Sequence, residues 1–478
     1  MVSVRTARLT LLTAIGVALA GCTPGPEWDR RTGATYSRMV ADEMGLVEDP
    51  ALERYVASIG QRIASHVPDR RFDFSFRIVD QEVPNAFALP GGYVYVSRGI
   101  LALTNSEDEL ANVLAHEMGH VEQRHAARQQ AAATLPGFFT LPGTIVSAIV
   151  SPALGDVLAS PFRQVGAVYL AGYGRSQERE ADRFAQETTA RAGYDPRGMS
   201  DLLDALGREE DLRQGDSPTP GFLDTHPPTP ERAATTARRA ATLAWSRTAG
   251  TEPDRAAYLR RLEGLAVGRD PRHGIFVGVR LLHALLDCSA RIPAGWAVAS
   301  SRGAFGAMSP EGDAILVLQP PARGTDPQQA ADAFVRDVLA SSKVHIERSH
   351  VTQVAGMPGY EITARLGNGD DAFDLEFAWL AHDGRIYRFT GVAPVANPEL
   401  IGAIRATISS FRPLTELQRS SIRVNRLHLA EARPGESIRA LSARTNNLWS
   451  TEQTAVMNGI AVDDTFTGGQ LVKIAVRD

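Results

Sequence analysis

The feature that most restricts the fold of this chain is the segment 112–126, NVLAHEMGHVEQRHA, which has the pattern of a buried helix but carries ionisable side chains. Its apolar residues, with one just before it, recur at helical spacing: Leu110, Val113, Leu114, Met118 and Val121. His116 and His120 are four residues apart and project from one side of the helix, with Glu117 beside them. Burying these groups without partners would cost several kcal/mol. The pattern therefore predicts a bound zinc ion, for which neutral imidazole nitrogens are good ligands.

The start of this helix is also encoded. Ser106 is followed three residues later by Glu109, the spacing of a capping box, and Glu107 and Asp108 place negative charge in the first turn. On such a helix the H-E-x-x-H spacing favours a metallopeptidase, in which the carboxylate of Glu117 holds a water or takes its proton. The alternative is a chance match on a helix with two surface or core histidines.

A catalytic zinc needs a third protein ligand and an open fourth position. A metzincin would place glycine at 123 and histidine at 126, but this chain has Gln123 and Ala126, which excludes that arrangement. His125 falls elsewhere on a continuous helix and is predicted to be a solvated polar residue. The third ligand must therefore come from another segment.

The stretch 174–193 supplies a glutamate on a second predicted helix. We expect this helix to be capped by Ser176 and to stop at Gly193. Glu178 and Asp182 are four residues apart and share a face, so Glu178 is the candidate third ligand and Asp182 the carboxylate that orients a ligand histidine. Glu180 points away from them and is predicted to be solvated. The alternative for this stretch is an ordinary charged helix face.

Two further segments flank the zinc motifs. Residues 93–96 alternate as a strand after a turn at 90–92, and such an edge could hold an extended peptide or be a plain hairpin. His226 is followed by Pro227 and Pro228, which predict a rigid turn, and Arg232 falls in the next predicted helix.

Four stretches match, in order, the motifs of one peptidase family. They are VPNAFALPGGYVYVSRGIL (83–101), LAHEMGH (114–120), EREAD (178–182) and THPPTPERAA (225–234). On these motifs the chain resembles the HtpX, BepA and CAAX-prenyl-protease type of gluzincin metallopeptidase over about residues 30–265, and the last motif resembles the BepA-like periplasmic branch.

The resemblance implies a mainly helical zincin-type domain with a small sheet, binding one Zn²⁺ through His116, His120 and Glu178, with Glu117 as the base. Asn85 and Ala86 would line the substrate cleft. His226 would lie close to the zinc, either as a fourth ligand that holds the enzyme off or as a group that stabilises the oxyanion. Arg232 would pair with an active-site carboxylate such as Asp182. The reaction implied is hydrolysis by an endopeptidase.

The N-terminal residues have the features of a targeting signal. Arg5 and Arg8 precede an apolar run at 9–20 that is too short for a membrane span. The run ends in LAGC, which resembles a bacterial lipobox, so residues 1–21 would be a signal peptide and Cys22 a lipidated N-terminus. An ordinary secretory signal is the alternative. Thr23 is not the aspartate of inner-membrane retention, which favours the outer membrane, facing the periplasm.

The net charge and the number of cysteines limit the possible binding partners and disulfides. The formal net charge is −5, and no basic stripe appears, which argues against nucleic acid as a partner. Of the two cysteines, Cys22 is assigned to the lipid and Cys288 to a buried apolar position, so we expect no disulfide.

Length and patterning predict an α+β multidomain chain. The 478 residues suit about three domains: the peptidase at 22–265, a second unit at 275–415 and a third at 420–478. The second unit reads as an α+β sandwich and weakly resembles PsbP/Mog-like domains at Pro293, Trp296 and Gly356, with an interaction or packing role. The third resembles a degenerate LysM module of βααβ form, with Asn458 and Gly459 at its turn, and would either bind peptidoglycan glycan or act as a cap.

BepA-type proteins carry C-terminal helical repeats, and no tandem repeat occurs here. Residues 129–155 contain no charge but are interrupted by prolines, which favours an apolar lid or a lipid-contacting loop over a transmembrane helix. The sequence therefore predicts a lipid-anchored zinc endopeptidase that degrades misfolded or stalled envelope proteins. Two alternatives remain: a peptidoglycan hydrolase, and a chaperone-like zinc lipoprotein with little turnover.

Overall fold

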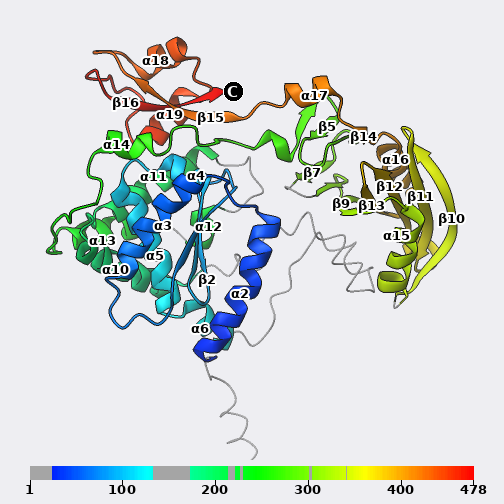
Figure 1. The fold of residues 1–478 in the computed structure, drawn as a ribbon, viewed down its shortest axis with the longest axis horizontal. Helices are drawn as coiled ribbons and strands as arrows, with labels where there is room; N and C mark the ends of the chain where they lie inside the picture. Colours follow the sequence, from blue (N-terminus) through cyan, green and yellow to red (C-terminus); the bar gives the residue numbers. More distant parts are fainter. Residues whose placement is uncertain (1–23, 133–172, 214–220, 227–229, 301–303, 341) are drawn as a thin grey trace, which may run out of the picture. The chain divides into compact units, whose positions relative to one another are not determined.

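A computed structural model describes residues 24–132, 173–213, 221–226, 230–300, 304–340 and 342–478 (Figure 1). The predicted signal peptide, Cys22, Pro227, Pro228 and nearly all of the uncharged stretch 129–155 lie outside these residues. The described residues form two compact units, the first containing 24–132, the described residues of 173–268, and 425–477, and the second containing the described residues of 269–424. None of the helices in the described ranges combines the length and the apolar character that crossing a bilayer requires.

The first unit is mainly helical around a small sheet. Its N-terminal part contains α2 (Pro26–Glu43), α3 (Pro50–Ala64), β1 (Ser75–Val79), β2 (Ala86–Leu89), β3 (Tyr93–Ser97), α4 (Arg98–Leu103), α5 (Glu107–Glu122) and α6 (His125–Ala132). After the gap come α10 (Arg175–Ala192), α11 (Gly198–Arg213), α12 (Phe222–Thr225), α13 (Pro230–Ala240) and α14 (Arg255–Arg260). The sheet has the order β1-β3-β2, with β1 parallel and β2 antiparallel to the central strand, so β2 lies at an edge.

Helix α5 lies at the centre of this unit and is buried along nearly its whole length. Its predicted start is confirmed, because the hydroxyl of Ser106 accepts a hydrogen bond from the Glu109 N–H. Gly119 allows α10 to pack closely, since a Cβ at this position would lie 3.2 Å from the Ala181 Cα. The sequence thus brings α5 and α10, the two helices with the predicted zinc motifs, into direct contact.

The sequence predicts the C-terminal end of α10 correctly but not its N-terminal end. Gly193 terminates the helix as expected, in the left-handed conformation with φ of 86°. The N-cap is Gly174 rather than Ser176, so that prediction is wrong by two residues. The side chain of Gln177 accepts the Gly174 N–H at 3.0 Å and takes over the capping role.

Residues 425–477 form β15 (Asn425–Glu431), α18 (Ile438–Thr445), α19 (Thr451–Asn458) and β16 (Leu471–Arg477), with the two strands antiparallel. The strand–helix–helix–strand order is the expected one. These residues also pack into the core that contains α5, through five apolar side chains: Leu427, Trp449, Val456, Met457 and Ala475. The segment is therefore continuous with the apolar core of the first unit.

A fully buried lysine secures this packing. Lys473 on β16 donates three hydrogen bonds from its Nζ to the carbonyl oxygens of Ala102 at 2.7 Å, Leu103 at 3.1 Å and Thr104 at 2.9 Å. These carbonyls lie at the end of α4, directly before the turn into α5. Burial lowers the pKa of Lys473 well below its usual value. The C-terminal strand is therefore tied to the start of the helix that carries the histidines.

The second unit is the predicted α+β sandwich, with additions. A seven-stranded sheet has the order β10-β11-β12-β13-β9-β8-β7, formed by Val344–Val354, Met357–Leu366, Phe373–His382, Arg385–Pro394, Ile315–Arg323, Phe305–Met308 and Ala297–Ser300. Helix α15 (Pro327–Phe334) packs against strands β11 and β12, and α16 (Pro398–Ser409) against β12 and β13. Separate apolar clusters contain Phe334 of α15 and Ile404 of α16.

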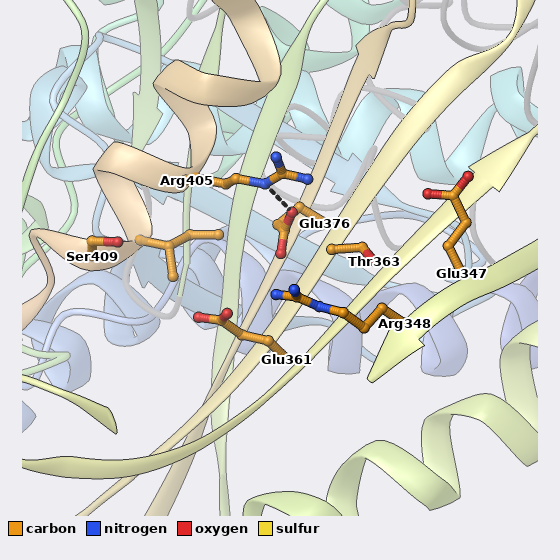
Figure 2. Close-up of a pocket in the computed structure, with 8 residues that line it drawn as sticks. Glu347, Arg348, Glu361, Thr363, Glu376, Arg405 and Ser409 are labelled. Carbon is orange, nitrogen blue, oxygen red and sulfur yellow. Dashed lines mark hydrogen bonds and ion pairs between the residues drawn. The ribbon is translucent and has the colours of Figure 1, made fainter. Parts of the chain in front are cut away.

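A smaller sheet in this unit was not predicted. It has the order β14-β6-β5-β4, formed by Arg412–Pro413, Cys288–Arg291, Arg280–His283 and Ile275–Val277. Cys288 is buried, as expected, and Asp383 and Gly384 form the hairpin turn between β12 and β13 with positive φ values of 48° and 69°. A cavity of about 480 Å³ lies between α16 and strands β10–β12 (Figure 2).

Candidate metal centre

Four buried side chains converge in the first unit. His116 and His120 come from α5, Glu178 from α10 and His226 from the end of α12, and one ligand atom of each lies within 4.8 Å of the others. The Nε2 atoms of His116 and His120 are 3.0 Å apart, and Nδ1 of His226 lies 3.0 Å from Oε1 of Glu178. All four residues are at most 3% exposed. The structure thus brings together the three predicted ligands and the predicted fourth group.

His226 is held in place by its neighbours. Its ring stacks on Phe222 with centroids 4.3 Å apart, and its N–H donates to the Phe222 carbonyl at 2.9 Å. The N–H of Phe222 donates in turn to the carbonyl of Pro84, just before β2. Burial opposes protonation of His226, but the carboxylates of Glu178 and Glu117 outweigh it and raise its pKa.

Asp182 and Arg232 contact two of the candidate ligands, His116 and Glu178, and hold them in position. Oδ1 of Asp182 lies 3.0 Å from Nδ1 of His116, as expected for a carboxylate that orients a ligand histidine. Arg232 donates to both oxygens of Asp182 at 2.7 Å, and its Nη1 lies 2.8 Å from Oε2 of Glu178. Burial opposes ionisation of Asp182, but its bonds with Arg232 and His116 keep its pKa well below the usual value. Arg232 therefore pairs with Asp182, as the resemblance implied, and also with Glu178.

The prediction that His125 is solvated is wrong, whereas Glu180 is solvated as expected, with its side chain 40% exposed. His125 is fully buried, with its Nδ1 at 2.7 Å from Nδ1 of His120 and its Nε2 at 3.2 Å from Oε2 of Glu180. Glu180 also accepts from Arg128 at 2.7 Å. The prediction assumed a continuous helix, but Arg124 has a positive φ of 51° and ends α5, so that α6 starts at His125 and turns it towards His120.

The contact with His125 orients the ring of His120, as the contact with Asp182 orients the ring of His116. If Nε2 of His120 binds a metal, Nδ1 of His120 carries the ring proton. The Nδ1–H of His120 then donates a hydrogen bond to Nδ1 of His125, and the Nε2–H of His125 donates a hydrogen bond to Glu180. Burial lowers the pKa of His125 to about 4, which keeps its ring neutral and able to accept. Each ligand histidine thus has an orienting partner.

Replacing His125 by phenylalanine is expected to weaken zinc binding about 10–100-fold, the usual effect of losing such a partner. Asparagine keeps an acceptor near the Nδ1 position and should retain more of the affinity. Competition with a chromogenic chelator measures the zinc dissociation constant. Equal constants for the wild type and the phenylalanine variant would contradict the orienting role.

Glu117 differs from the other carboxylates of the centre. It is fully buried, and within the described part of the chain neither of its oxygens has a hydrogen-bond partner. Oε1 lies 3.6 Å from Nε2 of His226, and burial raises the pKa of Glu117. A carboxylate with free oxygens beside a cluster of imidazoles is suited to accept a proton from a water molecule.

Tyr173 is a member of the centre that the sequence did not indicate. Its ring stacks on His120 with centroids 3.8 Å apart, and its N–H donates to the Thr225 carbonyl at 3.1 Å. Tyr173 is five residues before Glu178 and carries no pattern that marks it in the sequence. A cavity of about 180 Å³ opens beside Tyr173 and Glu178 and is lined by several arginines of α10 and α13.

Asn85 and Ala86 lie at the edge of the small sheet. Ala86 begins β2 and pairs with Val96, and the backbone N–H and carbonyl of Asn85 bond to the hydroxyl and N–H of Ser97 at 2.9 and 2.8 Å. Among the described strands only β3 pairs with β2. This edge packs against α5, so the strand expected to hold a substrate lies beside the histidine helix.

The donor set fits a zinc ion. Three imidazole nitrogens and a carboxylate oxygen are buried together, two of the histidines have orienting partners, and the oxygens of Glu117 accept no hydrogen bond from any described residue. Without a cation, burying so many polar groups at such short separations would be costly.

Comparison with known proteins agrees with this chemistry. Residues 50–240 match the model of peptidase family M48. The chain is 34% identical over 226 residues to a putative beta-barrel assembly-enhancing protease of Vibrio cholerae, covering 46% of each chain. It is 32% identical over 225 residues to the beta-barrel assembly-enhancing protease of Escherichia coli, covering 46% of this chain and 45% of the other.

A more distant relative is the mitochondrial metalloendopeptidase OMA1 of Saccharomyces cerevisiae, 30% identical over 151 residues, or 31% of this chain and 41% of the other. The chain spans about half the length of the curated relatives it matches. Among solved structures, cyanobacterial PsbP of Synechocystis aligns with 30% of this chain and 98% of its own length, at 14% identity and a TM-score of 0.25.

Proposed function

Since residues 50–240 of this chain belong to peptidase family M48, we propose that the protein is a zinc-dependent endopeptidase. The observation that carries this proposal is the buried group of His116, His120, Glu178 and His226 beside the carboxylate of Glu117, which accepts no hydrogen bond from the described residues. These four residues would hold the zinc ion, which would supply the Lewis acid needed to activate water and polarise the scissile carbonyl.

The chain's own residues divide the remaining work. Glu117 takes the proton of the attacking water and delivers it to the leaving amine. Arg232 keeps Asp182 and Glu178 ionised, and Asp182 and His125 hold the rings of the ligand histidines. The edge of β2 that pairs with no other described strand, with Asn85 and Ala86 at its start, binds the substrate as an added strand.

His226 acts as a latch in the resting protein, meaning a fourth ligand that occupies the position otherwise open to water. Its Nδ1 lies among the ligand atoms, 3.0 Å from Glu178 and 3.3 Å from His116, which supports a fourth ligand that fills the open position. The other role considered, stabilising the oxyanion, would require this nitrogen to leave the cluster and face the substrate.

Replacing His226 by alanine is expected to raise cleavage of unfolded casein about tenfold, the factor for a latched state favoured by about 1.4 kcal/mol. Zinc content should stay near that of the wild type, because three ligands remain. The exposed His345 provides a matched control when replaced by alanine. Reduced cleavage in the His226 variant alone would reverse the assignment and make this residue a catalytic helper.

The proposed site of action is the bacterial envelope, with Cys22 lipidated after removal of residues 1–21 and the protein anchored at the outer membrane facing the periplasm. The LAGC sequence supports this, and two relatives are named beta-barrel assembly-enhancing proteases. Misfolded or stalled outer-membrane proteins are therefore the proposed substrates. Replacing Cys22 by serine should release the protein into the soluble periplasmic fraction, and continued membrane association would contradict the anchor.

The alternative of a peptidoglycan hydrolase depends on the LysM-like residues 425–477. Purified sacculi separate the two functions, since their solubilisation without cleavage of unfolded protein would favour the hydrolase. A chaperone-like protein with little turnover would bind zinc and unfolded protein but cleave neither substrate, even after His226 is replaced.

A further inference from the structure

The second unit contains a cavity that the peptidase chemistry does not use. Ile401, Ile404 and Ile408 of α16 belong to the apolar core on their side of the seven-stranded sheet. Beside α16, over strands β10–β12, charged side chains enclose about 480 Å³ (Figure 2). A cavity of this size suits a small ligand, for which about 300–1,000 Å³ is usual.

The strand register builds the floor of this cavity. Arg348 of β10 pairs with Thr363 of β11, and Thr363 pairs with Glu376 of β12, so the three side chains form a row across the sheet. The next row places His350 opposite Glu361, at 3.4 Å between Nε2 and Oε2. The charges therefore follow from the pairing of three strands and are fixed by the fold.

A β-bulge adds a further charged side chain. The register of β10 and β11 shifts between Ile346 and Arg348, which leaves Glu347 as the extra residue. In a regular strand Glu347 and Arg348 would point to opposite faces, but here both line the cavity. Bulges re-aim side chains in this way beside binding sites.

The inner wall is an ion pair between a buried carboxylate, that of Glu376, and the exposed guanidinium of Arg405. Glu376 is 3% exposed, and its Oε2 accepts from Nε of Arg405 on α16 at 2.6 Å. Gly391, which pairs with Glu376 in the register, admits the helix, because a Cβ there would lie 2.4 Å from the Ile404 side chain. Figure 2 shows the terminal nitrogens of Arg405 directed away from Glu376, so they remain available for a ligand.

We propose that this cavity binds a peptide segment that carries a carboxylate and a cationic side chain next to each other. The guanidinium groups of Arg348 and Arg405 suit the carboxylate, and Glu347 and Glu361 suit the cation. A ligand with only negative charge would face three glutamates, and one with only positive charge would face two arginines. The second unit would thus recognise polypeptide independently of the metal centre.

Calorimetric titration of the full chain tests this, with Glu117 replaced by glutamine to prevent cleavage. The probe is the blocked dipeptide acetyl-Lys-Glu-amide, compared with acetyl-Lys-Gln-amide and acetyl-norleucyl-Glu-amide, which each lack one charge. We expect the doubly charged dipeptide to bind at least about fivefold more tightly than either of the others, a difference of about 1 kcal/mol.

Arg348→Met is the informative variant, since Arg348 is exposed and forms no ion pair with any described carboxylate, so the fold should tolerate its loss. It should weaken binding of the doubly charged dipeptide at least fivefold. Arg336→Met, at an exposed position outside the cavity, is the matched control and should change nothing. Equal binding of all three dipeptides, no binding, or unchanged affinity in Arg348→Met would overturn the proposal. Preference for the singly charged Glu peptide would also overturn it, in favour of a simple anion site.

Discussion

Replacing Glu117 by glutamine is expected to reduce cleavage of unfolded casein about 10²–10⁴-fold, the usual contribution of a positioned general base. The amide keeps the size of the side chain but cannot accept the proton. Because Glu117 is not one of the four converging ligand groups, zinc content should not change. Initial rates with labelled casein, beside metal analysis of the same samples, measure both effects.

The control for this variant is Glu122→Gln, six residues from His116 on the same helix. Glu122 is also buried, but its carboxylate accepts from the backbone N–H of Arg71 and lies away from the ligands. Wild-type cleavage in Glu117→Gln would remove this residue from the chemistry. A matching loss of zinc would show that the substitution acts through the fold of the centre.

Replacing Lys473 by methionine is expected to lower the free energy of unfolding of the first unit by about 2–4 kcal/mol. The substitution removes the hydrogen bonds of Lys473 to three buried carbonyls, of which that of Leu103 still accepts from the Asn105 amide at 3.0 Å. Each of the other two, left unsatisfied, costs about 1–3 kcal/mol. Relief of the cost of burying the ammonium offsets part of this loss. Urea unfolding followed by tryptophan fluorescence reports the change, since Trp449 packs in the same core.

The exposed Lys343 offers a matched control, because Lys343→Met changes the same atoms at a solvated position and should be neutral. Zinc affinity is a second measurement for Lys473→Met, since the three carbonyls directly precede the histidine helix. An unfolding midpoint equal to that of Lys343→Met would show that the C-terminal strand is a dispensable attachment.

The sequence predicted the core of the candidate site because its signals are local or periodic. The capping box at Ser106 and the H-E-x-x-H spacing define one helix, and the spacing of Glu178 and Asp182 defines a face of the other. Their meeting depends on Gly119, whose missing side chain lets α10 approach. Helical periodicity does not reveal such a contact between helices.

The predictions that failed also have physical causes: a turn or a distant contact that no local sequence pattern marks. His125 was misplaced because one residue with positive φ, Arg124, ends α5 and redirects the chain. Arginine is not a residue that usually marks such a position, so the sequence gives no warning of it. Tyr173 and Lys473 were missed because their partners are distant in sequence, His120 for the tyrosine and the carbonyls of 102–104 for the lysine.

The domain plan was predicted less completely. The alternating strands and helices of residues 275–415 do form a layered α+β unit, but its four-stranded sheet is built from strands of two to four residues that leave little periodic signal. For residues 425–477 the expected order of elements came from the resemblance to a LysM module. Their burial against α4 and α11 depends on long-range packing, which no local pattern shows.

The most direct test of the central proposal is the zinc content of the purified full chain, measured by plasma mass spectrometry in the wild type and in His116→Ala. The geometry of the centre predicts one zinc per chain in the wild type and strong depletion in the variant, because two of the four donor groups come from α5 and His116 is one of them. A wild-type protein without zinc, after purification free of chelators and incubation with the metal, would contradict the assignment of the metal centre and the peptidase function built on it.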